Sequence, residues 1–211
     1  MGPMKNLTVL SMLLVAAGLV GRPVSAQEPD GQSRPFRIGH FIVSVPQSWT
    51  PLSDADKTGA RAEFASDLAP GMTQYERAGD PAPRLGQFEI FQKPTDAQLL
   101  GWTIVIPEQT DFLKEILKRE DVQFEKGKSL SGGRIKGGSC SLIKVSGLEV
   151  VRIDVEMANG AKSTNLHFWS PKHPGIISTL MFGIRPQAIA PTAREYEAML
   201  ATLTVSEEVK D

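Results

Sequence analysis

The sequence predicts an α+β fold in which a mainly antiparallel sheet is covered by helices. Three observations indicate it. Alternating apolar and polar residues flank an Asn-Gly step within residues 148–169, a continuous apolar run follows at 176–182, and two segments with helical spacing lie at 110–121 and 192–203. Strands joined by short turns pair antiparallel, and helices placed between and after them bury their apolar stripes on the sheet, which favours this class.

The N-terminal segment has the layout of a secretory signal peptide. One cation, Lys5, precedes an apolar run over residues 7–20, and a Val-Ser-Ala cleavage motif ends at Ala26. The apolar run of about 14 residues is shorter than the roughly 20 residues of a spanning helix. We therefore expect residues 1–26 to be removed and the protein to be exported, to the periplasm or the extracellular space.

The mature chain is expected to be a flexible lead at 27–35 followed by a single globular α+β domain at 36–206. No later segment is apolar for long enough to span a bilayer. Because Lys5 and Arg22 leave with the signal, 21 basic residues remain against 24 acidic ones, a formal charge of about −3. Nucleic acid is therefore not expected as a partner. Cys140 is the only cysteine, so no internal disulfide can form.

The first half of the domain is expected to contain three strand segments. Apolar and polar side chains alternate in residues 36–46 on both sides of Gly39-His40, which predicts a strand pair with a tight turn. A second, shorter alternating run at 61–65 predicts another strand. An irregular loop rich in Pro, Gly and Asp is expected at 67–84, before strand character resumes at 85–92.

The middle of the chain combines an open alternative with a helix. Residues 101–107 fit either a buried strand or the end of a short helix that starts near Thr95. Thr110 is a suitable N-cap for a helix that ends near Asp121, with an apolar stripe on one side and charged residues on the other.

The Asn159-Gly160 step predicts a β-hairpin, because both positions of a two-residue turn of this type take positive φ. If the loop has two residues, the side chains of the two strands divide between the faces of the sheet. The apolar face then pairs Ile153 with Leu166 and Val151 with Phe168, and the polar face pairs Arg152 with His167 and Asp154 with Asn165.

The C-terminal part is expected to contain one central strand and one helix. The continuous apolar run at 176–182 predicts a strand covered on both faces in mid-sheet. Thr192 and Glu195 have the spacing of a capping box, which predicts the first turn of a helix. That helix would bury Tyr196, Met199, Leu200 and Leu203.

Three segments resemble a known family. They are Phe-Ile-Val-Ser-Val-Pro-Gln-Ser-Trp at 41–49, Asn-Gly at 159–160 and Tyr-Glu-Ala-Met-Leu-Ala-Thr-Leu at 196–203. They are similar to the PsbP/Mog-like α/β sandwich family, which includes DcrB-like bacterial envelope proteins. The resemblance covers about a third of the mature chain and concerns the fold. It implies a non-enzymatic accessory or binding domain, and it supplies no functional residues.

No catalytic residues, metal ligands or cofactor are expected from the motifs. The spacing of His167, His173 and Asp154 matches none of the compact zinc patterns. The surface expected to bind a partner is instead the polar face of the hairpin, because Trp and Arg are enriched at binding hot spots. It consists of Arg152, Asp154, Asn165, His167 and Trp169. A helix packed on that face is the alternative.

These observations predict an exported accessory or ligand- or protein-binding domain without catalytic activity of its own. Its partner would be a protein or a small molecule of the cell envelope. The alternative is an envelope hydrolase assembled from scattered residues, such as Ser170 or Ser141 with His167. A hydrolase of this kind needs a serine within hydrogen-bond reach of a histidine in a cleft, so the arrangement of these side chains separates the two functions.

Overall fold

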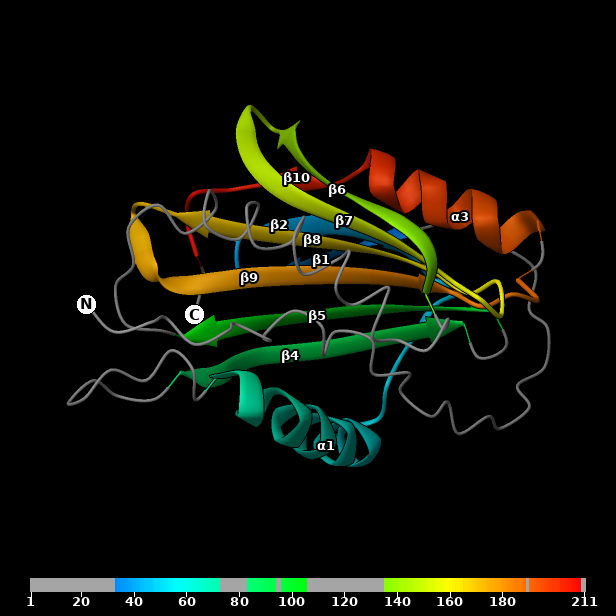
Figure 1. The fold of residues 1–211 in the computed structure, drawn as a ribbon, viewed down its shortest axis with the longest axis horizontal. Helices are drawn as coiled ribbons and strands as arrows, with labels where there is room; N and C mark the ends of the chain where they lie inside the picture. Colours follow the sequence, from blue (N-terminus) through cyan, green and yellow to red (C-terminus); the bar gives the residue numbers. More distant parts are fainter. Residues whose placement is uncertain (1–32, 73–82, 94–95, 106–134, 189, 210–211) are drawn as a thin grey trace.

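The computed structural model describes residues 33–72, 83–93, 96–105, 135–188 and 190–209. In this part of the chain two antiparallel sheets, one of three strands and one of seven, pack on each other, and two helices lie beside them (Figure 1). The small sheet has the order β1-β2-β10, with bounds Ser33–Ile38, Phe41–Pro46 and Thr204–Val205. The large sheet has the order β3-β4-β5-β9-β8-β7-β6, with bounds Thr50–Pro51, Arg84–Lys93, Ala97–Val105, His173–Ile184, Lys162–Ser170, Leu148–Met157 and Ile135–Val145. The helices are α1, Asp54–Met72, and α3, Ala190–Ala201.

This mainly β architecture shows that the expected helix-covered α+β sandwich is wrong. The reason is that the first strand pair does not join the large sheet. β1 and β2 form a separate sheet that lies over β4, β5 and β9, so a sheet occupies much of the face that helices were expected to cover. The helices in the described residues take smaller areas, α1 beside β4 and α3 beside β2.

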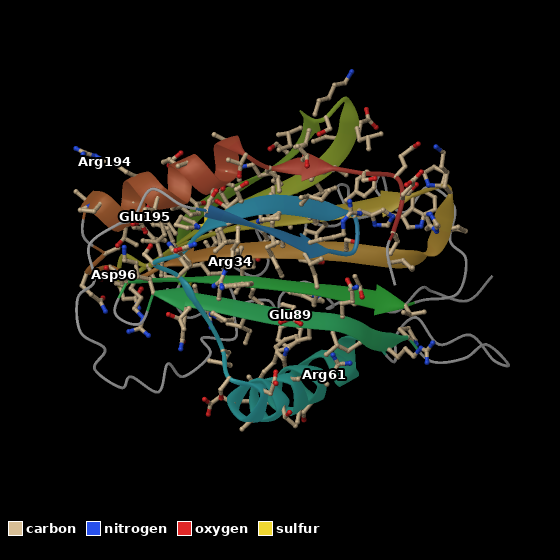
Figure 2. All side chains as sticks on the ribbon, turned by 180° about the vertical axis from the view of Figure 1, so that it is seen from behind. Arg34, Arg61, Glu89, Asp96, Arg194 and Glu195 are labelled. Atoms are coloured by element: carbon tan, nitrogen blue, oxygen red, sulfur yellow. The ribbon has the colours of Figure 1, made fainter. Side chains whose placement is uncertain are left out.

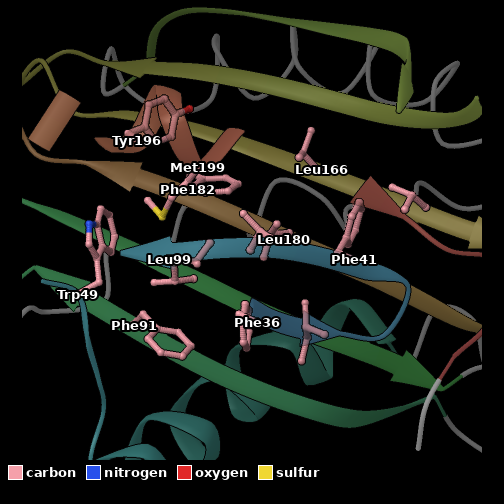
Figure 3. Close-up of a cluster of buried hydrophobic side chains, with 14 of the residues drawn as sticks. Phe36, Phe41, Trp49, Phe91, Leu99, Leu166, Leu180, Phe182, Tyr196 and Met199 are labelled. Atoms are coloured by element: carbon pink, nitrogen blue, oxygen red, sulfur yellow. The ribbon is translucent and has the colours of Figure 1, made fainter. Parts of the chain in front are cut away.

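The main core lies between the two sheets and α3 (Figure 3). Aromatic rings fill it, with Phe36 of β1 edge-to-face on Phe91 of β4 and Phe182 of β9 edge-to-face on Tyr196 of α3. Gly101 lets the sheets approach closely, because a Cβ there would lie 2.8 Å from the Ile38 side chain. The fully buried members of this core include Ile38, Phe41, Val43, Val45, Trp49, Leu99, Leu166, Leu180, Phe182 and Met199.

The opposite face of the large sheet carries two further apolar clusters. Phe64 of α1 packs in the first cluster, where the centroid of its ring lies 4.8 Å from that of Trp102 and 5.3 Å from that of Phe88. The second cluster lies over the other half of the sheet and consists of Ile135, Val151, Ile153, Val155 and Ile177. Val151, Ile153 and Val155 are therefore buried as the alternating pattern predicts, but on the face away from the main core, whereas Leu166 and Phe168, predicted to share their face, lie in the main core.

Several predicted elements are confirmed. β1 and β2 form a hairpin around Gly39-His40 with Ile38 opposite Phe41, although β1 starts at Ser33, within the segment expected to be a flexible lead. β4 covers the predicted strand at 85–92, and residues 97–105 form a strand, which resolves the open alternative. β9 is the central strand of the large sheet. The predicted signal peptide and the predicted helix at 110–121 lie outside the described residues.

The predicted strand at 61–65 is wrong, because these residues lie inside α1, which also covers part of the predicted loop at 67–84. Ser53 starts the helix. Its Oγ accepts a hydrogen bond from the Asp56 amide at 3.2 Å and donates to the Asp56 carboxylate at 2.6 Å. This cap satisfies a free amide of the first turn, and the Ser-x-x-Asp spacing was the signal for it.

The hairpin between β7 and β8 is confirmed, but its predicted register is wrong by one residue. The loop has three residues: the Gly160 amide donates to the Met157 carbonyl, and the Met157 amide donates to the Ala161 carbonyl. Gly160 has φ of +87°, as expected for a turn followed by a left-handed residue. Val151 therefore lies opposite His167, and Arg152 lies opposite Leu166.

The predicted capping box of the last helix is also wrong. α3 begins at Ala190, so Thr192 and Glu195 lie within the helix and bind other parts of the fold. The Thr192 hydroxyl donates to Asp96 at 2.8 Å, and the Glu195 carboxylate accepts from Trp49 Nε1 at 2.9 Å and from Lys93 Nζ at 2.8 Å. The predicted apolar face is confirmed, since Tyr196 and Met199 are buried and Leu200 and Leu203 pack on the core.

Candidate functional site

The five residues of the predicted binding surface do not share one face of the sheet. The one-residue change in register places Arg152 and Asp154 on the face of Leu166, which carries α3, and places Asn165 and His167 on the face of Val151. Trp169 lies on the second face as well, where it packs beside the Val151 cluster. The two strands of the hairpin therefore do not present these five side chains as one polar surface.

Arg152 and Asp154 belong to a hydrogen-bonded chain that reaches α3. Arg152 donates to both oxygens of Asp154, at 2.7 and 3.0 Å, and this contact raises the pKa of Arg152. The Thr164 hydroxyl also donates to Asp154, and the buried Tyr196 hydroxyl donates to Thr164, both at 2.6 Å. This hydrogen-bonded chain ties α3 to β7 and β8.

Asn165 and His167 are buried, and Trp169 is half-buried. His167 is buried, with Nδ1 3.0 Å from Thr179 Oγ1 and no partner for Nε2 among the described residues, and burial lowers its pKa to about 4. Asn165 is buried, and its Oδ1 has no partner in the same part of the chain. Trp169 donates its Nε1 hydrogen to the Pro174 carbonyl at 2.7 Å.

The serine–histidine pairs of the hydrolase alternative do not form. Ser141 lies opposite Arg152, on the other face of the sheet from His167, and the Ser170 hydroxyl accepts from the Lys172 amide. A different pair does meet, because His40 Nδ1 lies 2.7 Å from Ser178 Oγ. Both side chains are completely buried, so no substrate reaches this hydroxyl.

A pocket of about 310 Å³ lies at the outer edge of the large sheet, where β1 and α1 meet β4. β3 pairs only with Phe91 and Gln92 of β4. Residues 87–89 of β4, which line the pocket, are therefore not paired with β3, and α1 and β1 lie beside them. A bulge between Leu85 and Phe88 interrupts the pairing here, and bulges reorient side chains beside binding sites. The lining residues are Arg37 and Ile38 from β1, Lys57, Thr58 and Arg61 from α1, and Gln87, Phe88 and Glu89 from β4.

Local contacts fix the polar side chains of the pocket. Lys57 donates to both oxygens of Glu89 at 3.2 and 3.3 Å, which raises the pKa of Lys57 and ties α1 to β4. Arg61 Nη2 donates to the Leu85 carbonyl at 3.1 Å, and Arg37 Nη1 donates to the Glu208 carbonyl at 3.3 Å. Figure 2 shows Arg61 and Glu89 between α1 and β4, away from Asp96, Arg194 and Glu195.

Sequence reasoning missed this pocket because it placed residues 61–65 in a strand. On a helix, Lys57 and Arg61 are four residues apart and share one face. The Ser53 cap followed by this pair was the available signal for the helical part of the site. The approach of Arg37 from β1 had no local signal, since it depends on how the two sheets pack.

The described residues contain no group of three or more His, Cys, Asp or Glu side chains that could hold a metal ion. In the same part of the chain, no helix has both the length and the apolar composition needed to cross a membrane. No protein-family model and no curated protein matches the sequence.

Proposed function

We propose that the protein is an exported binding domain without catalytic activity of its own, and that its ligand enters the pocket between α1, β1 and β4. The observation that carries this proposal is the pocket itself. Its volume of about 310 Å³ lies at the lower end of the range for small-molecule sites. Ile38 and Phe88 supply apolar contact, and the other lining residues are polar or charged, so the pocket offers convergent polar groups that can orient a ligand.

The wider surroundings of the pocket support binding at this place. Gln87 Oε1 accepts a hydrogen bond from the Gly39 amide at 2.7 Å, so the bulge of β4 is tied to the turn of the small sheet. Lys57 and Arg61 tie the helix to the same strand. The walls are therefore held in place before a ligand arrives, which reduces the ordering cost of binding.

Export is tested on the protein secreted by its native host. The mature N-terminus is expected at Gln27, directly after the Val-Ser-Ala motif. N-terminal sequencing or intact-mass measurement of the secreted protein gives this result directly. Retention of residues 1–26 on the exported protein, or absence of the protein from the envelope and the medium, would contradict the export part of the proposal.

Ligand binding is tested by measuring thermal unfolding in the presence of small compounds grouped as acids, sugars, amines and neutral apolar molecules. A ligand present at a hundred times its Kd stabilises the native state by about 2.7 kcal/mol. For a domain of this size that corresponds to a rise in Tm of roughly 5–10 °C. We expect at least one group of compounds to produce such a rise.

Two tryptophan substitutions on α1 locate the binding. Thr58 lines the pocket and is exposed, so Thr58→Trp fills part of the space without removing a core residue. Ala62 is also exposed on α1 but does not line the pocket, so Ala62→Trp is the matched control. The Tm rise should disappear in Thr58→Trp and persist in Ala62→Trp. Equal responses of the two variants would show that the ligand binds elsewhere.

A further inference from the structure

We infer that the ligand of this pocket is a small anion, held through a carboxylate or phosphate group by Arg37 and Arg61. This inference rests on the proposed function, and it adds the chemical class of the ligand.

The pocket carries an excess of positive charge. Arg37, Lys57 and Arg61 line it together with one carboxylate, Glu89, so the lining residues carry a formal charge of +2, and Asp54, 3.4 Å from Lys57 Nζ, lowers the local excess to +1. The complete chain has a formal charge of −1, so the excess belongs to this place and not to the protein as a whole. A concave site with charge of one sign attracts ligands of the opposite sign.

Glu89 does not compensate the two arginines. Its carboxylate accepts two hydrogen bonds from Lys57, and this pair of charges largely cancels. Among the described residues, no carboxylate lies within ion-pair distance of Arg37 or Arg61. The guanidinium charges are therefore available to a ligand.

The two arginines are positioned by backbone carbonyls. Arg61 donates to Leu85 O and Arg37 donates to Glu208 O, and each bond uses one of the five N–H groups of a guanidinium. A carbonyl holds the side chain in place but does not neutralise it. The planar fork that remains matches the two oxygens of a carboxylate or phosphate group.

The dimensions of the pocket favour a small molecule. A volume of about 310 Å³ is near the lower limit for a ligand site, and a polymer backbone would need a longer groove. Apolar contact is limited to Ile38 and Phe88, both of which are almost completely buried. The charged group therefore provides most of the recognition.

The test measures binding of inorganic phosphate and of succinate to the purified mature protein by calorimetry at low ionic strength, with glucose and putrescine as the neutral and cationic comparisons. Arg61→Gln and Arg37→Gln should each weaken binding of the anion roughly ten- to hundred-fold, because each removes a hydrogen bond to a charged group. Arg194→Gln is the matched control, since Arg194 is exposed on α3 and does not line the pocket. Its affinity should equal that of the wild type.

A second pair of measurements separates binding from folding. Arg61→Lys keeps the charge but loses the fork, so its affinity should lie between those of the wild type and Arg61→Gln. The two Arg61 variants lose the same bond to Leu85 O, so a purely structural effect would be similar in both. Raising the salt concentration should weaken binding of the anion in the wild type.

Three outcomes would overturn the inference. Neither anion binds, or each binds equally well to the wild type, Arg61→Gln and Arg37→Gln, or glucose or putrescine binds in the pocket while phosphate and succinate do not. In the last case loss of binding in Thr58→Trp would leave the proposed function standing and would refute only the anionic class. Anion binding that depends on Arg61 and Arg37 supports both the proposed function and the anionic class of the ligand. Comparison of phosphate with succinate shows which oxyanion is preferred.

Discussion

Acidification from pH 7 to pH 4 is expected to lower the free energy of unfolding by several kcal/mol, because two buried histidines resist protonation. The pKa of His40 and that of His167 are both lowered from 6.5 to about 4. Burial is the cause for His167 and the largest cause for His40, where the nearby charges of His173 and Arg37 act in the same direction. A pKa lowered to this extent corresponds to about 3 kcal/mol for each residue.

The direction follows from where the protons bind. In the unfolded chain both imidazoles take up a proton below pH 6.5, whereas in the native protein they remain neutral until about pH 4. Between these values the unfolded state binds more protons, so stability falls as the pH falls. The stabilisation is complete above pH 6.5 and is lost by about pH 4, and the total is comparable to the stability of a typical domain.

The surroundings of the two rings explain why protonation of either imidazole destabilises the native state. The Nε2 atom of each ring is buried and has no hydrogen-bond partner in the part of the chain that the structure describes, so an added charge there would remain unsolvated. The Nδ1 atoms are already engaged, in His40 with Ser178 Oγ and in His167 with Thr179 Oγ1. Phe168 lies edge-to-face on the His40 ring, with the centroids 5.0 Å apart, and offers no polar group.

The measurement is the urea midpoint of unfolding at a series of pH values from 8 to 4. His167→Asn keeps a polar atom near Thr179 but does not titrate, so its stability should fall with pH about half as steeply as that of the wild type. His173→Asn removes one of the smaller causes of the lowered pKa of His40 but leaves the burial of both histidines unchanged, so it should retain most of the pH dependence. An equal slope in the wild type and in His167→Asn would show that this histidine does not contribute.

The strands were predictable where local chemistry decides them. Alternation of side chains identified β2, β7 and β8, a continuous apolar run identified β9, and the glycines that need positive φ identified two turns. What could not be predicted was the length of the Asn-Gly loop. The same dipeptide fits a two-residue turn and a three-residue turn with Gly160 in the left-handed region, and the difference moves every side chain of one strand to the other face.

This one-residue difference also decided the candidate site. The predicted surface required Arg152 and His167 to lie opposite each other, but Leu166 is the partner of Arg152. The pocket that does exist takes residues from β1, α1 and β4, and Arg37 and Arg61 line it together only after the two sheets have packed. A packing arrangement between distant segments leaves no periodic signal in any of them, so residue patterns could not locate this site.

Replacement of Gly39 by alanine is expected to destabilise the protein by roughly 2–5 kcal/mol, because it combines backbone strain with a steric clash. Gly39 has φ of +52°, where an L side chain costs about 1–2 kcal/mol. A Cβ at this position would also lie 2.1 Å from Ser178 Oγ and 2.7 Å from Thr103 Cγ2, so the turn must move away from β5 and β9. Such overpacking typically costs a further ~1–3 kcal/mol.

That movement would also weaken contacts that hold the two sheets together. The Gly39 amide donates to Gln87 Oε1 at 2.7 Å, and the His40 amide donates to Ser178 Oγ at 3.0 Å. Both bonds link the turn of the small sheet to the large sheet. Because Gln87 lines the pocket, Gly39→Ala should weaken ligand binding as well as lower the urea midpoint.

Substitutions of two other glycines separate the cost of backbone strain from the cost of the steric clash. Gly160 has φ of +87° but its nearest side-chain atom would be 3.5 Å from an added Cβ, so Gly160→Ala should show only the backbone cost of about 1–2 kcal/mol. Gly59 lies in α1 with open space around it, and Gly59→Ala should stabilise the protein by roughly 0.5–1 kcal/mol. If Gly39→Ala and Gly160→Ala lose the same stability, then the close approach of the turn to Ser178 contributes nothing, and the sheets are held together by the apolar core alone.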